Sequence, residues 1–136
     1  MQVSQIMTPD PDTARPQDTL RAVAAKMDRG DFGSVPVVED GRLIGVVTDR
    51  DIAVRAVGQG LGPDTEVSEV MTADPVCVAP DSEVEDAAEI MQDEQLRRLF
   101  VTDDDDRLVG VIALADVALA DDQQLSGKTL EEISEA

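Results

Sequence analysis

The sequence contains one pattern twice. Residues 3–8 read VSQIMT and residues 67–72 read VSEVMT, so that Met7 and Met71 lie 64 residues apart. Glycines at 45 and 110 repeat at an offset of 65, because one residue is inserted near 103–106. A duplication over nearly the whole chain indicates two copies of one supersecondary unit. A copy of roughly 60 residues cannot cover both faces of its own sheet, which predicts that the two copies pack together.

Each copy predicts the order β-α-β-β-α. In the first copy a short extended segment is followed by a helix over 19–29 with Asp18 as N-cap, a strand over 34–38 and a hairpin turn at 39–42. A second strand and a helix over 50–57 complete that copy. In the second copy Ser82 and Glu85 form a capping box, with a strand at 99–102 and a final helix at 115–119. The predicted fold class is α+β, with the two motifs packed sheet to sheet about a pseudo-two-fold axis.

The duplication also predicts the domain organisation. Motif 1 covers residues 1–60, a Gly-rich linker covers 61–66, motif 2 covers 67–125 and an acidic tail covers 126–136. A short acidic helix in this tail would place Leu130 and Ile133 on one side, and the sequence leaves open whether the tail is ordered.

Charge and composition restrict the partners. The formal net charge is −19, so we expect no nucleic-acid partner, because a phosphate backbone needs a basic surface. The absence of His excludes His-based catalysis and His metal ligands. No apolar run approaches the roughly 20 residues of a membrane span, and no export signal is visible, so we expect a cytoplasmic protein without membrane contact.

The sulfur-containing residues favour structural roles. The single cysteine, Cys77, permits no internal disulfide and is expected to be a small buried residue, with an oxidisable or intermolecular thiol as the alternative. Methionines at 7, 27, 71 and 91 occupy equivalent positions in the two copies and are expected to fill the core rather than to sense redox state.

The residues 43–51, LIGVVTDRD, predict a strand that ends at Thr48 and leads directly into a helix. This junction brings a hydroxyl, the Asp51 carboxylate and unpaired backbone N–H groups together. A carboxylate can accept both hydroxyls of a cis-diol, and the start of a helix favours an anion. Thr48 and Asp51 equally fit a helix capping box, and the two roles can coexist. The second copy keeps Asp116 but has Ala113 in place of the threonine.

The glycine, apolar pair, Thr and Asp of residues 45–51 resemble the signature of CBS domains, and the Met-Thr segment and residues 35–38 also fit. Two such motifs in tandem resemble a Bateman module, and the layout is similar to standalone actinobacterial CBS-pair proteins of the hypoxic-response type. The resemblance implies a binding module for AMP, ADP, ATP or S-adenosylmethionine, with ligands in two clefts between the copies. It implies that the Asp binds ribose, that the Thr supports ribose or phosphate, and that basic residues of the partner copy bind phosphate.

Two adjacent arginines, Arg97 and Arg98, begin the strand at 99–102 in a region with few cations. Guanidinium groups bind phosphate in a bidentate manner, and the family geometry places this pair opposite the first junction. An ion-pair surface is their alternative role. The predicted ligand residues are Thr48, Asp51, Arg97 and Arg98, with Val46, Pro75 and Val76 beside the adenine. A second cleft, containing Asp116, Ser34 and Arg50, is predicted to be weak or empty, since Ala113 lacks a hydroxyl and residues 33–34 carry no charge.

Together these features predict a regulatory sensor of adenosine nucleotides and not an enzyme, with no metal and no cofactor beyond the regulatory ligand. Apolar helix faces predict a homodimer that signals to its mate or to a downstream protein that the sequence does not identify. The alternative is a ligand-free interaction or stress-survival protein that uses the CBS scaffold as a dimeric platform. Residues 103–106 are expected to form a solvated turn, because they lack the Gly and distal Glu of a calcium loop.

Overall fold

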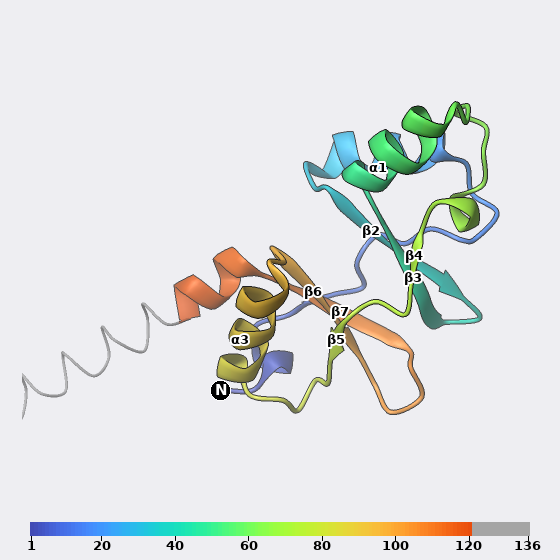
Figure 1. The fold of residues 1–136 in the computed structure, drawn as a ribbon. Helices are drawn as coiled ribbons and strands as arrows, with labels where there is room; N and C mark the ends of the chain where they lie inside the picture. Colours follow the sequence, from blue (N-terminus) through green and yellow to red (C-terminus); the bar gives the residue numbers. More distant parts are fainter. Residues whose placement is uncertain (121–136) are drawn as a thin grey trace, which may run out of the picture.

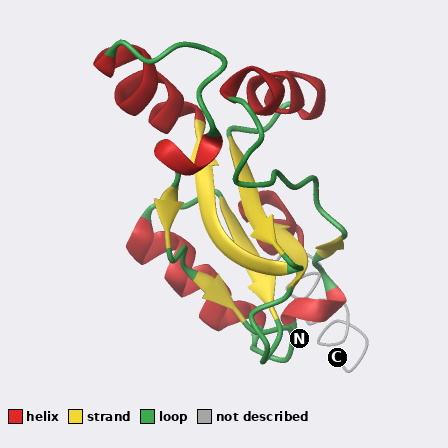
Figure 2. Cartoon of the chain, turned by 90° about the vertical axis from the view of Figure 1, so that its right-hand side faces the viewer, coloured by secondary structure: helices red, strands yellow, loops and turns green. Residues whose placement is uncertain are grey.

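A computed structural model describes residues 1–120 and confirms the α+β class with two repeats (Figures 1 and 2). The first repeat contains η1 (Val3–Gln5), β1 (Thr8–Pro9), α1 (Leu20–Gly30), β2 (Ser34–Glu39), β3 (Arg42–Thr48), α2 (Asp49–Asp51), η2 (Ile52–Ala56) and η3 (Val57–Gln59). The second contains η4 (Val67–Glu69), β4 (Thr72–Ala73), β5 (Cys77–Val78), α3 (Val84–Glu94), β6 (Arg98–Thr102), β7 (Leu108–Ala113) and a helix over 114–120. The acidic tail at 126–136 lies outside the described residues.

The two repeats exchange their leading segments. The first sheet has the order β2-β3-β4, and the second has the order β1-β7-β6-β5. Strand β1 of the first repeat therefore pairs with β7, with Thr8 opposite Val111, and β4 of the second repeat pairs with β3, with Thr72 opposite Val46. Each sheet contains strands from both repeats, so neither half of the sequence forms a complete sheet alone.

The exchange extends into two aliphatic cores. Val67 and Val70 of the second repeat are buried in the core of the first sheet, and Val3 of the first repeat is buried in the core of the second. Helices α1 and α3 cover these cores with apolar stripes at helical spacing. The buried members of the stripes are Leu20, Val23 and Met27 on α1, and Val84, Ala87 and Met91 on α3.

The helix N-termini differ from the sequence prediction. The N-cap of α1 is Thr19, whose Oγ1 accepts from the Ala22 N–H at 3.2 Å, while Asp18 accepts from the Arg15 N–H. The predicted Ser82 capping box is also wrong, because the N-cap of α3 is Glu83 without a side-chain cap. The exchanged segments supply acceptors here: Met1 O accepts from Val84 N at 2.9 Å, as Thr65 O accepts from Leu20 N at 3.0 Å. Long-range backbone contacts thus satisfy N–H donors for which the local sequence provides no acceptor.

The turns agree with the sequence, but the second helix of the first repeat is less regular than expected. Asp40 and Gly41 have φ of 54° and 81°, as the predicted hairpin turn requires. The expected helix at 50–57 is a short α-turn followed by a π-helical segment and a 3-10 turn, because the Val57 N–H bonds to Ile52 O as well as to Ala53 O. Within residues 1–120, no helix is long and apolar enough to cross a bilayer.

A methionine of each exchanged segment lies directly over a strand glycine. A Cβ added to Gly45 would lie 2.6 Å from Met71 Sδ and 3.0 Å from the Thr72 carbonyl O, and Gly110 has the same distances to Met7 and Thr8. The signature glycine is therefore required for the approach of the exchanged strand.

We predict that Gly45→Ala lowers the free energy of unfolding by about 1–3 kcal/mol, since the added methyl group separates β4 from β3. Gly62→Ala is the matched control, because nothing lies within 4 Å of its Cβ position and its backbone needs no positive φ. Urea titration followed by circular dichroism measures both variants. Equal stability of the two would contradict this role of Gly45.

Candidate functional site

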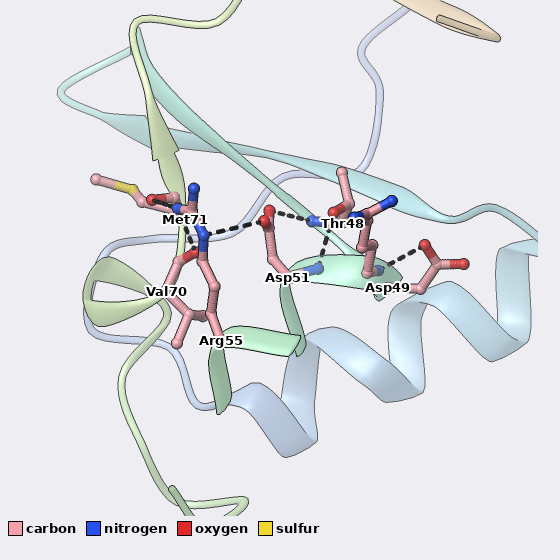
Figure 3. Close-up of polar contacts among 7 residues, drawn as sticks. Thr48, Asp49, Asp51, Arg55, Val70 and Met71 are labelled. Carbon is pink, nitrogen blue, oxygen red and sulfur yellow. Dashed lines mark hydrogen bonds and ion pairs between the residues drawn. The ribbon is translucent and has the colours of Figure 1, made fainter. Parts of the chain in front are cut away.

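The junction after β3 is closed by a reciprocal capping box (Figure 3). Thr48 Oγ1 accepts from the Asp51 N–H at 3.0 Å, and Asp51 Oδ2 accepts from the Thr48 N–H at 3.0 Å. The second oxygen of the carboxylate, Oδ1, lies 3.7 Å from Arg55 Nε. Asp51 is only 8% exposed. Both carboxylate oxygens of Asp51 are therefore engaged within the protein.

Arg55 connects this junction to the second repeat. Its Nη1 lies 3.5 Å from both Val70 O and Met71 O, in the exchanged segment that precedes β4 (Figure 3). The Arg55 side chain is half exposed, so its ion pair with Asp51 contributes little stability by itself. Arg55 nevertheless places a cation beside the Asp51 carboxylate, to which the family resemblance assigns the binding of ribose.

The equivalent junction after β7 has fewer internal partners. Asp116 Oδ2 accepts from the Ala113 N–H at 3.2 Å, but Ala113 has no hydroxyl to complete the box. The residue equivalent to Arg55 is Ala120, so no guanidinium is supplied from that position. The Asp116 side chain is half-buried and lines a cavity of about 280 Å³.

That cavity, which we call the Asp116 cavity, lies where the two repeats meet. The leading segment of the first repeat contributes Thr8, Asp10, Pro11 and Asp12, the loop after α1 contributes Phe32, and the second repeat contributes Arg98, Val111, Ala113 and Asp116. A second cavity of about 530 Å³ shares Phe32, Arg98 and Ala113 with it, and adds Asp31, Gly33, Arg97, Leu114, Ala115 and Ala118. Arg98 and Phe32 therefore line two neighbouring cavities, the larger of which has the size of a small-molecule site.

Arg98 has an unusual environment for a charged side chain. It is half-buried, its Nη1 donates to the Ser34 carbonyl O at 3.0 Å, and its Cζ lies 4.8 Å from the centre of the Phe32 ring and 5.9 Å from that of Phe100. Burial lowers the pKa of Arg98, and the charge of Asp12 partly opposes this effect. Arginine remains protonated at neutral pH under such shifts.

Arg98 also lacks an ion-pair partner within the part of the chain that the structure describes. Arg15, Arg21 and Arg55 each lie within 4.0 Å of a carboxylate, but no such contact forms at Arg98 among residues 1–120. A partly desolvated cation without a counter-ion favours the binding of an anion.

The structure shows which of the predicted ligand residues line the two cavities. Strand β6 pairs antiparallel with β7, and Arg98 lies opposite Ala113, so the two arginines line cavities at the second junction. Thr48 lies opposite Ser34, whose carbonyl group binds Arg98. Arg97 and Arg98 therefore line these two cavities without Thr48 and Asp51, and a joint role of the four residues in one ligand site stays a prediction. The alanine at 113, which suggested a weak cleft, leaves Asp116 with fewer internal contacts.

The remaining predicted residues occupy other places. Val46 lies opposite Thr72 in the first sheet, Pro75 and Val76 lie between β4 and β5, and the exposed Arg50 donates its backbone N–H to Asp49. Phe32, Thr8, Asp10 and Asp12 were missed by the sequence analysis. The scarcity of aromatic residues, with two Phe in the whole chain, is the one sequence signal that could have drawn attention to Phe32.

The structure also describes the contacts of Cys77 and of the turn at 103–106, for which the sequence raised a reactive thiol and a calcium loop as alternatives. Burial raises the pKa of the Cys77 thiol, whose Sγ donates to Pro75 O at 3.2 Å, and a raised pKa lowers the thiolate fraction. In the expected turn at 103–106, Asp103 Oδ1 accepts from the N–H groups of Asp105 and Arg107. No cluster of three metal-ligating side chains occurs in the described residues.

Comparison with known proteins decides the family. The CBS domain family matches residues 3–58 and 67–122. The chain belongs to the CBS domain family. The CBS domain-containing protein YhcV of Bacillus subtilis is 40% identical over 133 residues, which cover 97% of this chain and 94% of YhcV. The resemblance to hypoxic response proteins is also confirmed, because the structure of Hypoxic Response Protein I with two coordinated zinc ions matches with a TM-score of 0.79 and 31% identity, over 87% of this chain and 97% of that one.

Two further solved CBS structures contain adenosine compounds. CBSX2 in complex with AMP matches with a TM-score of 0.79 and 26% identity, over 90% of this chain and 96% of that one. The CBS domain pair of MJ0100, in complex with 5′-methylthioadenosine and S-adenosyl-L-methionine, matches with a TM-score of 0.77 and 26% identity, over 94% and 98% of the two chains. CBS pairs are in general regulatory modules and not catalysts.

The two junction carboxylates are expected to differ in their contribution to stability. Asp51→Ala removes one half of a capping box and the partner of Arg55, and should lower the free energy of unfolding by about 2 kcal/mol. Asp116→Ala removes one hydrogen bond and should cost about 0.5 kcal/mol. Both residues occupy the same position of a helix, so dipole effects are matched. Equal losses in urea titrations would contradict a structural role specific to Asp51.

Proposed function

We propose that this protein is a non-catalytic regulatory module that binds an adenosine nucleotide of the AMP, ADP or ATP class in the Asp116 cavity. The observation that carries the proposal is the half-buried Arg98, which has no ion-pair partner among the described residues and faces a cavity that also contains Asp116. The AMP complex of CBSX2 and the S-adenosylmethionine complex of MJ0100 support an adenosine ligand.

The charged residues that line the Asp116 cavity suggest how a nucleotide would be oriented in it. Asp116 has the acceptor oxygens needed for the ribose hydroxyls. Asp10 and Asp12 line the same cavity and would repel a phosphate, whereas their oxygens suit the amino group of adenine. The phosphate would then extend past Arg98 into the larger cavity, where Arg97 and the first residues of the helix over 114–120 lie.

A ligand in this position would contact both repeats at once. Phe32 comes from the first repeat, and Arg98 and Asp116 come from the second. Binding to the assembled arrangement shifts the population toward it, and the protein thereby reports nucleotide level. A ligand present at 100 times its dissociation constant adds about 2.7 kcal/mol to the stability of the folded state.

We predict that AMP, ADP or ATP raises the melting temperature of the protein, and that Arg98→Ala weakens nucleotide binding about 10- to 100-fold by removing a charge-assisted contact. Isothermal titration calorimetry measures the affinities. Arg107→Ala is the control, since it removes the same charge at the hairpin where Arg107 meets Arg42. Unchanged affinity of Arg98→Ala would overturn the assigned site.

A ligand-free dimeric platform is the second candidate, and exposed apolar side chains favour a dimer in either case. Val57 is 71% exposed and Leu119 is 59% exposed, both on the second helical segments of their repeats. Val57 also borders an apolar groove of about 170 Å³ beside α1. No thermal shift with AMP, ADP, ATP, NADH or S-adenosylmethionine would favour the platform.

We predict a homodimer that buries these side chains, so that a Val57→Asp, Leu119→Asp double variant becomes monomeric. Light scattering coupled to size-exclusion chromatography at micromolar concentration gives the mass. Val76→Asp serves as a control, because Val76 is an exposed apolar residue outside these helices. A wild-type monomer would contradict the dimer.

A further inference from the structure

We propose that Phe32 is a positioning residue for Arg98, and that it thereby sets the preference of the module for phosphorylated over unphosphorylated adenosine. The inference rests on the proposed function, because it concerns the phosphate end of the same ligand.

The first observation is the use of the aromatic residues. The chain contains two Phe and no Trp or Tyr, and both Phe rings lie against the Arg98 guanidinium. The nearer ring, that of Phe32, comes from the first repeat, whereas Arg98 belongs to the second. Guanidinium groups stack on aromatic faces at such distances while their N–H groups remain directed outward at the ring edge.

The second observation is that the end of helix α1 also restricts the Phe32 ring. Helix α1 ends at Asp31, a left-handed C-cap with φ of 53°, and the Phe32 N–H bonds to Met27 O at 3.2 Å. The ring then lies directly over Gly30, where an added Cβ would overlap with ring carbons. Gly30 and Arg98 therefore both restrict the ring.

The third observation is that only one cleft has this arrangement. At the offset of 64, Phe32 corresponds to Leu96, Arg98 to Ser34, and Gly30 to Glu94. The equivalent positions of the other cleft therefore hold no aromatic ring, no cation and no glycine. The backbone is alike in both places, since Gln95 is also a left-handed cap and the Leu96 N–H bonds to Met91 O.

The carboxylates around Arg98 explain why its guanidinium group needs fixed contacts with uncharged partners. Asp10, Asp12 and Asp116 line the Asp116 cavity, and a freely moving arginine would pair with one of these carboxylates. The Phe32 ring and the Ser34 carbonyl group instead hold the guanidinium with uncharged partners. Its charge stays available to a phosphate, and one of its five N–H donors is used by the Ser34 contact.

The test compares AMP with adenosine by isothermal titration calorimetry on the full-length protein. Phe32→Leu should weaken AMP binding about 3- to 30-fold, as expected for loss of a cation–π contact, and change adenosine binding less than about 2-fold. Phe32→Tyr keeps the ring and should restore the wild-type ratio of the two affinities. Gly30→Ala should act like Phe32→Leu, because it displaces the ring.

A ligand-free measurement separates this proposal from the proposed function. In NMR spectra of the wild type, the side-chain protons of Arg98 should show ring-current shifts that decrease in Phe32→Leu, where only the more distant Phe100 ring remains, and are retained in Phe32→Tyr. Absence of these shifts, or an equal loss of AMP and adenosine affinity in Phe32→Leu, would overturn the positioning role alone. Failure of the wild type to bind any adenine nucleotide, with the shifts present, would overturn the nucleotide function and with it the phosphate preference.

Discussion

Backbone pairing between the two repeats holds this structure together. Strand β1 completes the sheet of the second repeat, and β4 completes the sheet of the first. The same exchanged segments bury Val3 and Val67 in the opposite cores and provide the carbonyl groups of Met1 and Thr65 to the first turns of α3 and α1. A repeat without its partner would have an open sheet edge and unsatisfied helix donors. The cavities between the repeats exist because this exchange fixes where the repeats meet.

The two repeats have similar backbones at their strand–helix junctions, but the side chains around the two junction carboxylates differ. Around Asp51, Thr48 and Arg55 satisfy the carboxylate and make the junction a structural element. Around Asp116, the corresponding residues are Ala113 and Ala120, which leave the carboxylate at the edge of a cavity. The missing hydroxyl at Ala113 leaves Asp116 with fewer internal contacts, as the proposed binding of a ligand there requires.

The high negative charge of the chain makes the placement of single cations important. Arg15, Arg21 and Arg55 each pair with a carboxylate through a side chain that is more than half exposed, and such pairs contribute little energy. Arg98 is different because a carbonyl group and two aromatic rings surround it in a partly buried position. There the attraction for a phosphate is screened less by water and salt than it would be at the surface.

The sequence by itself determined the duplication, the α+β class, the hairpin turn at 39–42 and the CBS family, because these follow from local periodicity and from matched spacing of Gly, Thr and Asp. It did not determine the helix caps at Thr19 and Glu83, since distant carbonyl groups bond to the amides there. It also did not show that Arg98 lies opposite Ala113 and donates to the Ser34 carbonyl group, because strand register and long-range contacts decide both. Only the tertiary structure brought Phe32 to Arg98, because that contact joins residues 66 positions apart through the crossing of two repeats, which no local pattern encodes.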